Sequence, residues 1–578
     1  MTSTGGHLPP DAPGPDGDDP HQAPDESALA ESFPTIEDAL AAAEEEADPE
    51  TAERLAAAAE EDAEREADLQ VVLRSGLFSG PDSDVLDEVL DDETDTPDDD
   101  TDLSTDPATG RGGPGADGVA PSSDQGTGTP EEEALLADVT AQIISRAPEH
   151  DIQPSLDRVR DALDLLGNPQ SAYPIVHLTG TNGKTSTARM VEALLRERGL
   201  TTGRFTSPHL HTIRERIAIG GEPISTPDFL TAYADIAPYV DLVDGQHTDS
   251  GGKRLSFFEL LTVLGYAAFA DAPVDAAVVE VGLGGRWDAT NVADGQVAAI
   301  TPISLDHTRW LGSTLIDIAN EKVGIIKDGA TVVLARQPED VEGVVLAAAA
   351  QAGARVVREG VDIEVADREL AVGGQVLTLR TPAGTYEGIH LPLHGAHQAQ
   401  NALIALATVE AFFGGAALDG GVVEAAFASV RSPGRIEVVR SSPLIIVDAA
   451  HNPAGVEALR EGLAEAFDLE HVVGVVGVMA DKDVEAVLGE LEPLLDEIVV
   501  TDAGTERAMP AEELAEIARD VFDEDRVHLR PRLSEAIDTA AGLAEANAEE
   551  VVTRTAVVVT GSAVLAGRAR EVTGHTGA

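Results

Sequence analysis

Short apolar runs alternate with amphipathic helical segments from about Glu131 to the end of the chain. Repeated alternation of strand and helix favours parallel sheets with crossover helices. The apolar runs of the first half lie at 174–180, 275–282, 296–304 and 330–335. Ligands of such sheets bind at the carboxyl ends of the strands. The pattern therefore predicts an α/β protein whose functional residues directly follow its strands.

A second series of strand, polar turn and helix begins after the sequence SPGRIE at 432–437. Between the two series, alternating residues at 362–393 with Gly-rich turns predict a small antiparallel patch. We therefore expect two α/β domains, a larger one at 134–430 and a smaller, Rossmann-like one at 438–578. Residues 431–437 form the expected hinge between them.

The first 130 residues have a different composition from the rest of the chain. They contain 36 Asp and Glu against 4 Arg and no Lys, a net charge of −32 out of the −67 of the whole chain. Such a segment cannot bury enough apolar surface to offset chain entropy, so we expect a disordered acidic extension at 1–133, with a transient helix around 36–77. We favour a dispensable solubilising role over recruitment of a basic partner.

Composition also excludes several classes of function. The negative charge argues against a general nucleic-acid-binding surface, because phosphates would be repelled. The chain has no cysteine, so disulfides and thiolate metal sites are impossible. No segment approaches the roughly 20 apolar residues that span a bilayer. We expect a cytoplasmic monomer whose partners are small molecules, with neither nucleic acid nor membrane among them.

The sequence HLTGTNGKTSTARM at 177–190 contains two closely spaced glycines before a lysine. Gly180 and Gly183 allow the backbone to approach an anion, the amides at the start of the following helix supply donors, and Lys184 adds a positive charge. The spacing is shorter than that of the common phosphate-binding loop. Taken alone, it leaves an ordinary strand-to-helix turn as an equal alternative.

Lysine is rare in this chain: only five of its 38 Lys and Arg residues are lysines. Its five lysines are Lys184, Lys253, Lys322, Lys327 and Lys482. Because arginine serves on a solvated surface, a retained lysine indicates a local need for a compact or deprotonatable amine.

Seven sequence blocks occur in a characteristic order. They are GTNGKTS, TSPHLHTIRERI, EVGLGGRWDATNV, SLDHTRWLGSTLIDIANEKVGIIK, HGAHQAQNA, SPGRIE and VDAAHNP. The series closely resembles the folylpolyglutamate synthase/dihydrofolate synthase family, a branch of the Mur-ligase-like ATP-dependent amide ligases. The resemblance covers about residues 135–573 and identifies the short glycine spacing as the Mur-ligase form of the phosphate loop. It implies a Mur-ligase-like fold, a P-loop ATPase domain followed by the Rossmann-like domain.

The resemblance also implies which residues bind ATP and two Mg²⁺ ions. For ATP they are Gly180, Thr181, Asn182, Gly183, Lys184, Thr185, Asn401, Arg435 and Asp448; for the metals they are Ser207, Glu280, His307 and a CO₂-modified (carbamylated) Lys322. Lys184, His307 and Lys322 are the implied catalytic residues.

Several of these residues also have structural interpretations. Glu280 ends an apolar strand and suits either a buried hydrogen-bond acceptor or a hard oxygen ligand, of which we favour the ligand. Ser207 also suits a turn before proline, and His307 a hydrogen-bonded histidine. Asp448 also suits a helix cap ahead of Pro453. Lys482 we assign to structure or to the amino-acid site.

The substrate residues follow from the same resemblance. For the pterin they are Phe257, Phe258, Glu259, Leu260, Trp287, Asp288 and Ala289; for glutamate, less strongly, they are His451 and Ser562. The two phenylalanines suit a core equally well. Trp287 stands where the family usually has leucine, which loosens this inference, and Ser432 where it often has tryptophan.

The implied activity is ATP-dependent addition of L-glutamate to 7,8-dihydropteroate and to reduced folates through an acyl phosphate. Two alternatives remain, a Mur-type ligase acting on a UDP-MurNAc-peptide and a nucleotide-binding regulator without catalytic activity. The blocks around Trp287 and His307 disfavour the first, and joint retention of Glu280, His307 and Lys322 disfavours the second.

Overall fold

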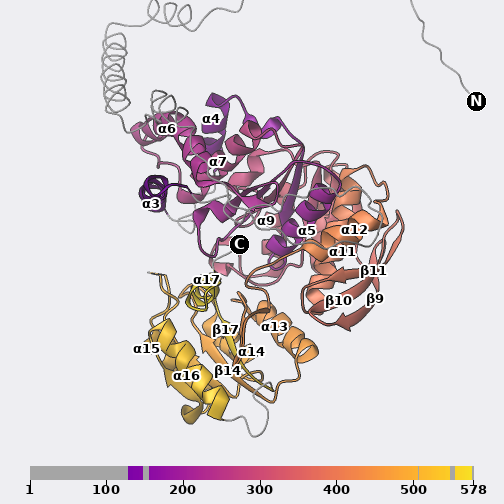
Figure 1. Ribbon diagram of the computed structural model, residues 1–578. Coiled ribbons are helices and arrows are strands. Elements are labelled where there is room, and N and C mark those ends of the chain that lie inside the picture. Colours follow the sequence, from indigo (N-terminus) through magenta and orange to yellow (C-terminus); the bar gives the residue numbers. More distant parts are fainter. Residues whose placement is uncertain (1–127, 148–154, 506, 547–553, 576–578) are drawn as a thin grey trace, which may run out of the picture. The chain divides into compact units, whose positions relative to one another are not determined.

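A computed structural model describes residues 128–147, 155–505, 507–546 and 554–575. The predicted acidic extension lies outside these ranges except for residues 128–133. Of these, 130–133 form the first turn of helix α3 (Pro130–Ile144), so the expected disorder is wrong there. The expected helix around 36–77 lies wholly outside the described ranges. The described chain forms two large sheets and one small sheet, each packed against helices (Figure 1).

The first large sheet has eight strands in the order β4-β3-β2-β5-β1-β6-β7-β8. Their bounds are β1 Ile175–Thr179, β2 Thr202–Phe205, β3 Ile217–Ile219, β4 Glu222–Pro223, β5 Ala276–Glu280, β6 Val297–Ile300, β7 Thr331–Leu334 and β8 Arg355–Arg358. All neighbours pair in parallel except β2 with β3 and β3 with β4. Because Leu178 pairs with both Glu280 and Ala299, the ends of β1, β5 and β6 meet at one edge.

Both faces of this sheet are covered. The helices around it are α3 Pro130–Ile144, α4 Asp157–Leu165, α5 Lys184–Glu197, α6 Thr226–Asp249, α7 Phe257–Asp271, α8 Thr308–Leu311, α9 Leu315–Lys322, α10 Glu339–Gln351, α11 Ala396–Phe412 and α12 Gly420–Ser429. Val176 and Leu178 pack with α5, α11 and α12, whereas Ile175 packs with α3, α4, α6 and α7. In Figure 1 these two groups of helices lie on opposite sides of the strands. Burial on both faces explains the nearly continuous apolar runs of the sequence.

The expected antiparallel patch is confirmed. Strands β9 Glu364–Ala371, β10 Gly374–Arg380 and β11 Thr385–Leu391 form a three-stranded antiparallel sheet in the order β11-β10-β9. Its apolar face, which includes Leu377 and Ile389, joins the core beneath α11 and α12.

The second large sheet has six strands in the order β12-β13-β17-β14-β15-β16. They are β12 Glu437–Ser441, β13 Leu444–Val447, β14 His471–Val476, β15 Glu497–Val500, β16 Val527–Leu529 and β17 Thr555–Thr560, parallel except for β12. Helices α13 Pro453–Ala466, α14 Val484–Leu491 and α15 Ala511–Val521 cover one face; α16 Leu533–Ala546 and α17 Ala563–Val572 cover the other. Short 3₁₀ helices lie at Pro169–Ser171, Ile213–Arg216, Ala289–Val292, Val323–Ile325 and Glu524–Arg526.

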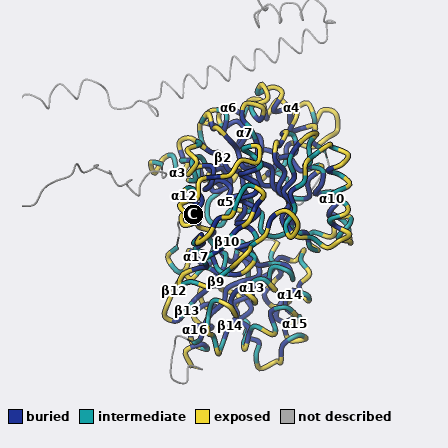
Figure 2. The backbone as a smooth tube through the Cα atoms, turned by 90° about the vertical axis from the view of Figure 1, so that its right-hand side faces the viewer, coloured by how far each residue is buried: buried dark blue, intermediate teal, exposed yellow. Residues whose placement is uncertain are grey.

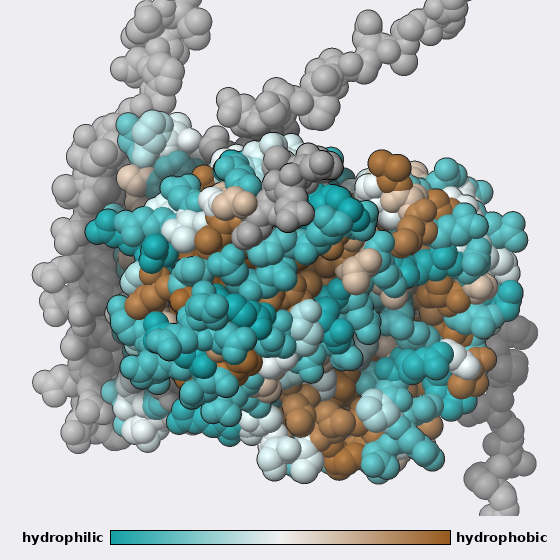
Figure 3. All heavy atoms as spheres, turned by 90° about the horizontal axis from the view of Figure 1, so that it is seen from below, coloured by the Kyte–Doolittle hydropathy of each residue, from teal (hydrophilic) through white to brown (hydrophobic). Residues whose placement is uncertain are grey.

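Burial follows this layering. In Figure 2 buried residues run along the strands, and exposed residues mark the outer turns of the helices. The face seen in Figure 3 is largely hydrophilic, with apolar atoms in separate smaller groups. Within the part of the chain that the structure describes, every helix is too short or too polar to cross a lipid bilayer.

Candidate active site

The glycines of the phosphate loop between β1 and α5 cannot be replaced without displacing neighbours. Gly180 has φ +149°, and a Cβ there would lie 1.8 Å from Oγ1 of Thr301. Gly183 has φ +85°, and a Cβ there would lie 2.5 Å from Oδ1 of Asn401. Both contacts are far shorter than atoms allow, and positive φ favours glycine. The backbone of the loop therefore lies tightly against Thr301, the residue that follows β6, and against α11.

Lys184, the first residue of α5, folds back over this loop. Its Nζ donates hydrogen bonds to the carbonyl oxygens of Gly180 and Thr181, at 3.2 and 3.0 Å. Burial lowers the pKa of Lys184, while the charges of Glu280 and Asp306 oppose that shift. A cation that is bonded only to carbonyl oxygens lacks a full counter-charge, so it favours an incoming anion.

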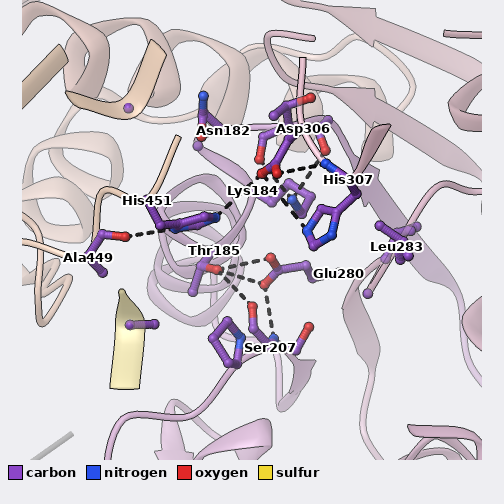
Figure 4. Close-up of a pocket in the computed structure, with 18 of the residues that line it drawn as sticks. Asn182, Lys184, Thr185, Ser207, Glu280, Leu283, Asp306, His307, Ala449 and His451 are labelled. Carbon is purple, nitrogen blue, oxygen red and sulfur yellow. Dashed lines mark hydrogen bonds and ion pairs between the residues drawn. The ribbon is translucent and has the colours of Figure 1, made fainter. Parts of the chain in front are cut away.

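A carboxylate and a hydroxyl lie together at the N-terminal end of α5. Glu280 ends β5 and is 1% exposed, and the hydroxyl of Thr185 lies 3.0 and 2.9 Å from its two oxygens. The backbone N–H of Ser207 donates to the same carboxylate at 3.3 Å, as Figure 4 shows. Burial raises the pKa of Glu280, against the effect of Lys184. Hard oxygen atoms concentrated beside a phosphate loop suit Mg²⁺.

Lys322, the last residue of α9, reaches the same loop from another direction. It is 4% exposed, and its Nζ donates to the carbonyl oxygen of Gly180 at 2.7 Å. Burial, together with the charge of Lys184, lowers the pKa of Lys322 to about 7. A substantial fraction of this amine is therefore neutral, and nucleophilic, near neutral pH.

The loop after β6 places an acid and an imidazole at the centre of the site (Figure 4). His307 adopts a left-handed backbone conformation with φ +49°, and burial lowers its pKa to about 4 despite the neighbouring carboxylate of Asp306. Asp306 forms an ion pair with Lys482 at 2.6 Å, and Nε2 of His451 lies 3.5 Å from its other oxygen. Lys482 thus differs from the two lysines at the phosphate loop, because its charge is already paired.

The second large sheet contributes groups from its own strand ends. Asp448 follows β13 and accepts hydrogen bonds from the backbone N–H groups of Ile436 and Ala450, both at 2.8 Å. Burial raises the pKa of Asp448, against the charge of Arg435. Ser562 follows β17 and caps α17 by accepting from the N–H of Leu565 at 3.0 Å.

These groups line one cavity of about 390 Å³. Six Lys and Arg side chains line it against five Asp and Glu, although the chain as a whole carries a charge of −67. Apolar side chains line one part, including Phe258, Leu283 and both tryptophans of the chain, Trp287 and Trp310. The charges that line the cavity are therefore close to balance, unlike those of the strongly acidic chain, and part of its wall is aromatic.

Comparisons with known proteins, by sequence and by structure, point to one family. Residues 178–409 match the Mur ligase middle domain, and residues 434–563 match the Mur ligase glutamate ligase domain. A dihydrofolate synthase/folylpolyglutamate synthase of Mycobacterium tuberculosis is 50% identical in an alignment of 476 residues that covers 79% of this chain and 98% of that protein. A folylpolyglutamate synthase of Lacticaseibacillus casei is 34% identical, over 72% of this chain and 93% of that protein.

The crystal structure of the Mycobacterium tuberculosis folylpolyglutamate synthase complexed with ADP and AMPPCP superimposes with a TM-score of 0.74 at 50% identity. It covers 77% of this chain and all of the other. The chain belongs to the dihydrofolate synthase/folylpolyglutamate synthase family. It therefore has the Mur-ligase fold that the sequence predicts.

The cavity lining contains almost all of the site residues that the family resemblance implies. The residues of the phosphate loop, Asn401, Arg435, Asp448, Ser207, Glu280, His307, Lys322, Phe258, Glu259, Trp287, Asp288, Ala289, His451 and Ser562 all line it. Phe257 and Leu260 do not. They lie three residues apart on one face of α7 and are buried in the apolar core, where the guanidinium of Arg216 stacks on the Phe257 ring.

Glu259 lines the cavity, but its carboxylate is hydrogen-bonded to Arg158 of the same chain. Its carboxylate accepts hydrogen bonds from Arg158 of α4 at 2.7 and 3.2 Å and from the N–H of Ser256 at 2.7 Å. Sequence reasoning missed Arg158, because nothing local connects it with a residue 101 positions away.

Asp306 and Trp310 were also missed among the residues of the cavity. Both lie in the block that carries His307, and Trp310 is one of only two tryptophans in the chain. The available signals were an acidic residue just beyond the apolar run 296–304 and a rare aromatic residue in a polar loop.

Proposed function

We propose that the cavity is the active site of an ATP-dependent ligase that adds L-glutamate to 7,8-dihydropteroate and to reduced folates. Glutamate ligation to folates is the activity of the family to which the chain belongs. The observation that most supports this activity is the phosphate loop beside Thr185 and Glu280, in a cavity that strand ends of both large sheets line.

ATP binds with its phosphates at the loop. The backbone amides of Gly180–Lys184 and the Nζ of Lys184 receive the phosphate oxygens. Asn401, Arg435 and Asp448 hold the remainder of the nucleotide, and since Arg435 and Asp448 belong to the second half of the chain, closure around ATP excludes water.

Two Mg²⁺ ions would complete the proposed nucleotide site and, when bound, would supply positive charge beside the transferred phosphoryl group. The oxygens of Thr185, Ser207 and Glu280 would hold the first, and His307 and a carbamate on Lys322 the second. No group of three or more His, Asp or Glu side chains among the described residues is arranged to hold a metal unaided. That fits Mg²⁺, which takes several of its ligands from substrate phosphates and water. The neutral fraction of Lys322 can add to CO₂, forming the N–C bond of a carbamate and releasing one proton.

The acceptor lies beside Phe258, Glu259, Trp287, Asp288 and Ala289. Its carboxylate attacks the γ-phosphorus of ATP, which gives an acyl phosphate and ADP. The deprotonated α-amine of glutamate then attacks the acyl carbon and inorganic phosphate leaves. Lys184 stabilises the charge of the transferred group, and His451 and Ser562 hold the incoming glutamate.

Further proposals concern the chain as a whole. We assign residues 1–133 to an acidic extension, 134–430 to the ATPase domain, 431–437 to a hinge and 438–578 to the glutamate ligase domain. The protein acts in the cytoplasm as a monomer, without nucleic-acid or membrane partners.

Phosphate release tests the proposal. The purified protein is supplied with ATP, Mg²⁺ and L-glutamate, together with dihydropteroate, tetrahydrofolate or a UDP-MurNAc-peptide. We expect phosphate and a glutamylated product with both pterins and none with the UDP-sugar. If only the UDP-sugar supported turnover, the Mur-type alternative would be identified. If none of the three acceptors supported turnover, the regulator without catalytic activity would be favoured.

A further inference from the structure

Asp306 joins three segments that are far apart in the sequence. Its carboxylate accepts from Nζ of Lys482 at 2.6 Å and from Nδ2 of Asn452 at 3.0 Å, and also from its neighbour's backbone N–H, that of His307, at 2.8 Å. Only 8% of the side chain is exposed. Burial by itself would raise the pKa of Asp306, but the hydrogen bond from His451 and the charges of His307 and Lys482 hold it well below its usual range.

Asn452 extends this connection to the phosphate loop. The side-chain amides of Asn452 and Asn182 exchange two hydrogen bonds, at 3.1 and 3.2 Å. The oxygen of Asn452 also accepts from the N–H of Gly455 at 2.8 Å, which caps α13. Both amide protons and both acceptor positions of this buried side chain are thus used, so it has one allowed orientation.

The phosphate loop is also bonded directly to the segment that carries Asp306. Thr181 donates its hydroxyl to the carbonyl oxygen of Ser304 at 3.0 Å and accepts from the Ser304 N–H at 3.1 Å. The N–H of Thr181 donates to the carbonyl oxygen of Pro302 at 2.9 Å. The loop, the segment 302–306 and the start of α13 therefore form one continuous hydrogen-bonded unit.

We propose that Asp306 and Asn452 are positioning residues for the second half of the reaction, in which the amine of glutamate attacks the acyl phosphate. The inference depends on the proposed ligase function. Lys482 and Asn182 complete this set, which we call the Asp306 network. The network fixes the strand ends that carry the proposed glutamate contacts against the loop where the acyl phosphate forms.

The geometry favours this step over phosphoryl transfer. His451, a proposed glutamate contact, is adjacent to Asn452 in the chain and 3.5 Å from Asp306. Attack on the acyl carbon requires reacting atoms within about 3–3.5 Å, and a displacement of about 1 Å can cost 10²-fold in rate. In the proposed function the phosphates and the acceptor are held mainly by residues of the first half of the chain, so we expect phosphoryl transfer to be less sensitive to this register.

The opposite end of α13 offers a matched control. Glu465, in the last turn of α13, forms an ion pair with Arg368 of β9 at 2.5 and 3.2 Å. This pair also joins the two halves of the chain, but it is partly exposed and lies outside the cavity lining. Arg368→Ala therefore weakens the attachment of α13 without disturbing the Asp306 network.

The experiment compares glutamate with hydroxylamine as the nucleophile. Hydroxylamine traps an acyl phosphate as a hydroxamate and needs no amino-acid site, so it reports the first half of the reaction. Two variants are tested, Asp306→Asn, which has nearly the same shape, and Asn452→Ser, which retains a good helix-capping oxygen. Thermal unfolding and the affinity for ADP check that each variant is folded.

We expect glutamate-dependent kcat to fall about 10- to 100-fold in both variants, with the KM for glutamate raised. In both variants the rate of hydroxamate formation should stay within about threefold of the wild-type rate. In Arg368→Ala the rates with glutamate and with hydroxylamine should both stay within about twofold of wild type. Equal losses with both nucleophiles, or no loss with glutamate, would overturn the positioning role. If one variant is unfolded, the other decides. Failure of the wild-type protein with both nucleophiles would instead refute the proposed function.

Discussion

The three lysines of the cavity are held in two different ways at its two sides. At the phosphate loop, Lys184 and Lys322 donate to backbone carbonyl oxygens, and burial lowers the pKa of both. Where the halves of the chain meet, Lys482 is paired with the carboxylate of Asp306 at 2.6 Å. Buried cations without a full counter-charge favour an anionic ligand, whereas a paired cation stabilises the protein's own geometry. This difference supports the proposal that the phosphate loop receives substrate and that the Asp306 network holds the two halves in register.

The largest effect should follow from removing the cation nearest the expected phosphates. Lys184→Ala should lower kcat by about 10²–10³-fold, because it removes stabilisation of charge in the transition state. ADP formation under saturating substrates measures this loss. Lys253→Ala serves as the matched control, since Lys253 is exposed and lies outside the cavity lining. A Lys184→Ala protein with more than about a tenth of wild-type kcat would contradict the distinction between the two kinds of lysine.

A somewhat smaller effect should separate charge from carbamate chemistry at Lys322. Lys322→Ala and Lys322→Arg should both lower kcat by about 10- to 100-fold, as is usual when a group close to a metal is lost. Arginine retains the positive charge but does not lose its proton to react with CO₂. Steady-state rates of the two variants, measured side by side, test this. If arginine restored activity, Lys322 would act by charge alone.

The pH dependence of stability sharpens the comparison further. The pKa of Lys322 is about 7 in the folded protein and 10.5 in the unfolded chain, so between these values the unfolded state binds more protons. The free-energy cost of burying the protonated amine is therefore fully present below pH 7. This destabilisation of the folded state decreases as the pH rises towards 10.5. Relative to Lys322→Met, the wild-type free energy of unfolding should rise by on the order of 1 kcal/mol or more across this range.

Denaturant unfolding of both proteins in CO₂-free buffer measures that difference. Subtracting the variant removes the general effect of pH on so acidic a chain. A difference that did not change with pH would show that Lys322 is not the buried, uncompensated amine described above.

The smallest effect is expected from the acidic extension. Deleting residues 1–127 leaves α3 with its capping residue Thr129, which accepts from the N–H of Glu132 at 3.2 Å. Activity of the shortened protein should stay within about twofold of the full chain, as for changes away from a folded core. Lost activity, or loss of a basic partner in a binding assay, would assign the extension a function of its own.

Much of the fold could be predicted because its signals are local. Apolar runs ending in Gly180 and Gly282 marked buried parallel strands, and the glycine spacing with Lys184 marked the phosphate loop. The hydrogen bonds that join the two halves depend on tertiary structure instead. Asn182 and Asn452 are 270 residues apart, and Asp306 and Lys482 are 176 apart. No periodicity or short motif encodes such a pair.

The segment 257–260 shows a second limit of sequence reasoning. The resemblance assigned four consecutive residues to the pterin, but consecutive residues of a helix point in different directions. In α7 this turns Phe257 and Leu260 into the core, while Phe258 and Glu259 reach the cavity. Which residues of a motif contact a ligand depends on the orientation of the whole helix.

A crystal structure of the protein with Mg²⁺ and a non-hydrolysable ATP analogue tests the central claim most directly. We predict the γ-phosphate against Nζ of Lys184, with Mg²⁺ between that phosphate and the oxygens of Thr185 and Glu280. A triphosphate bound elsewhere, with Lys184 still bonded only to the carbonyl oxygens of its own loop, would contradict the account.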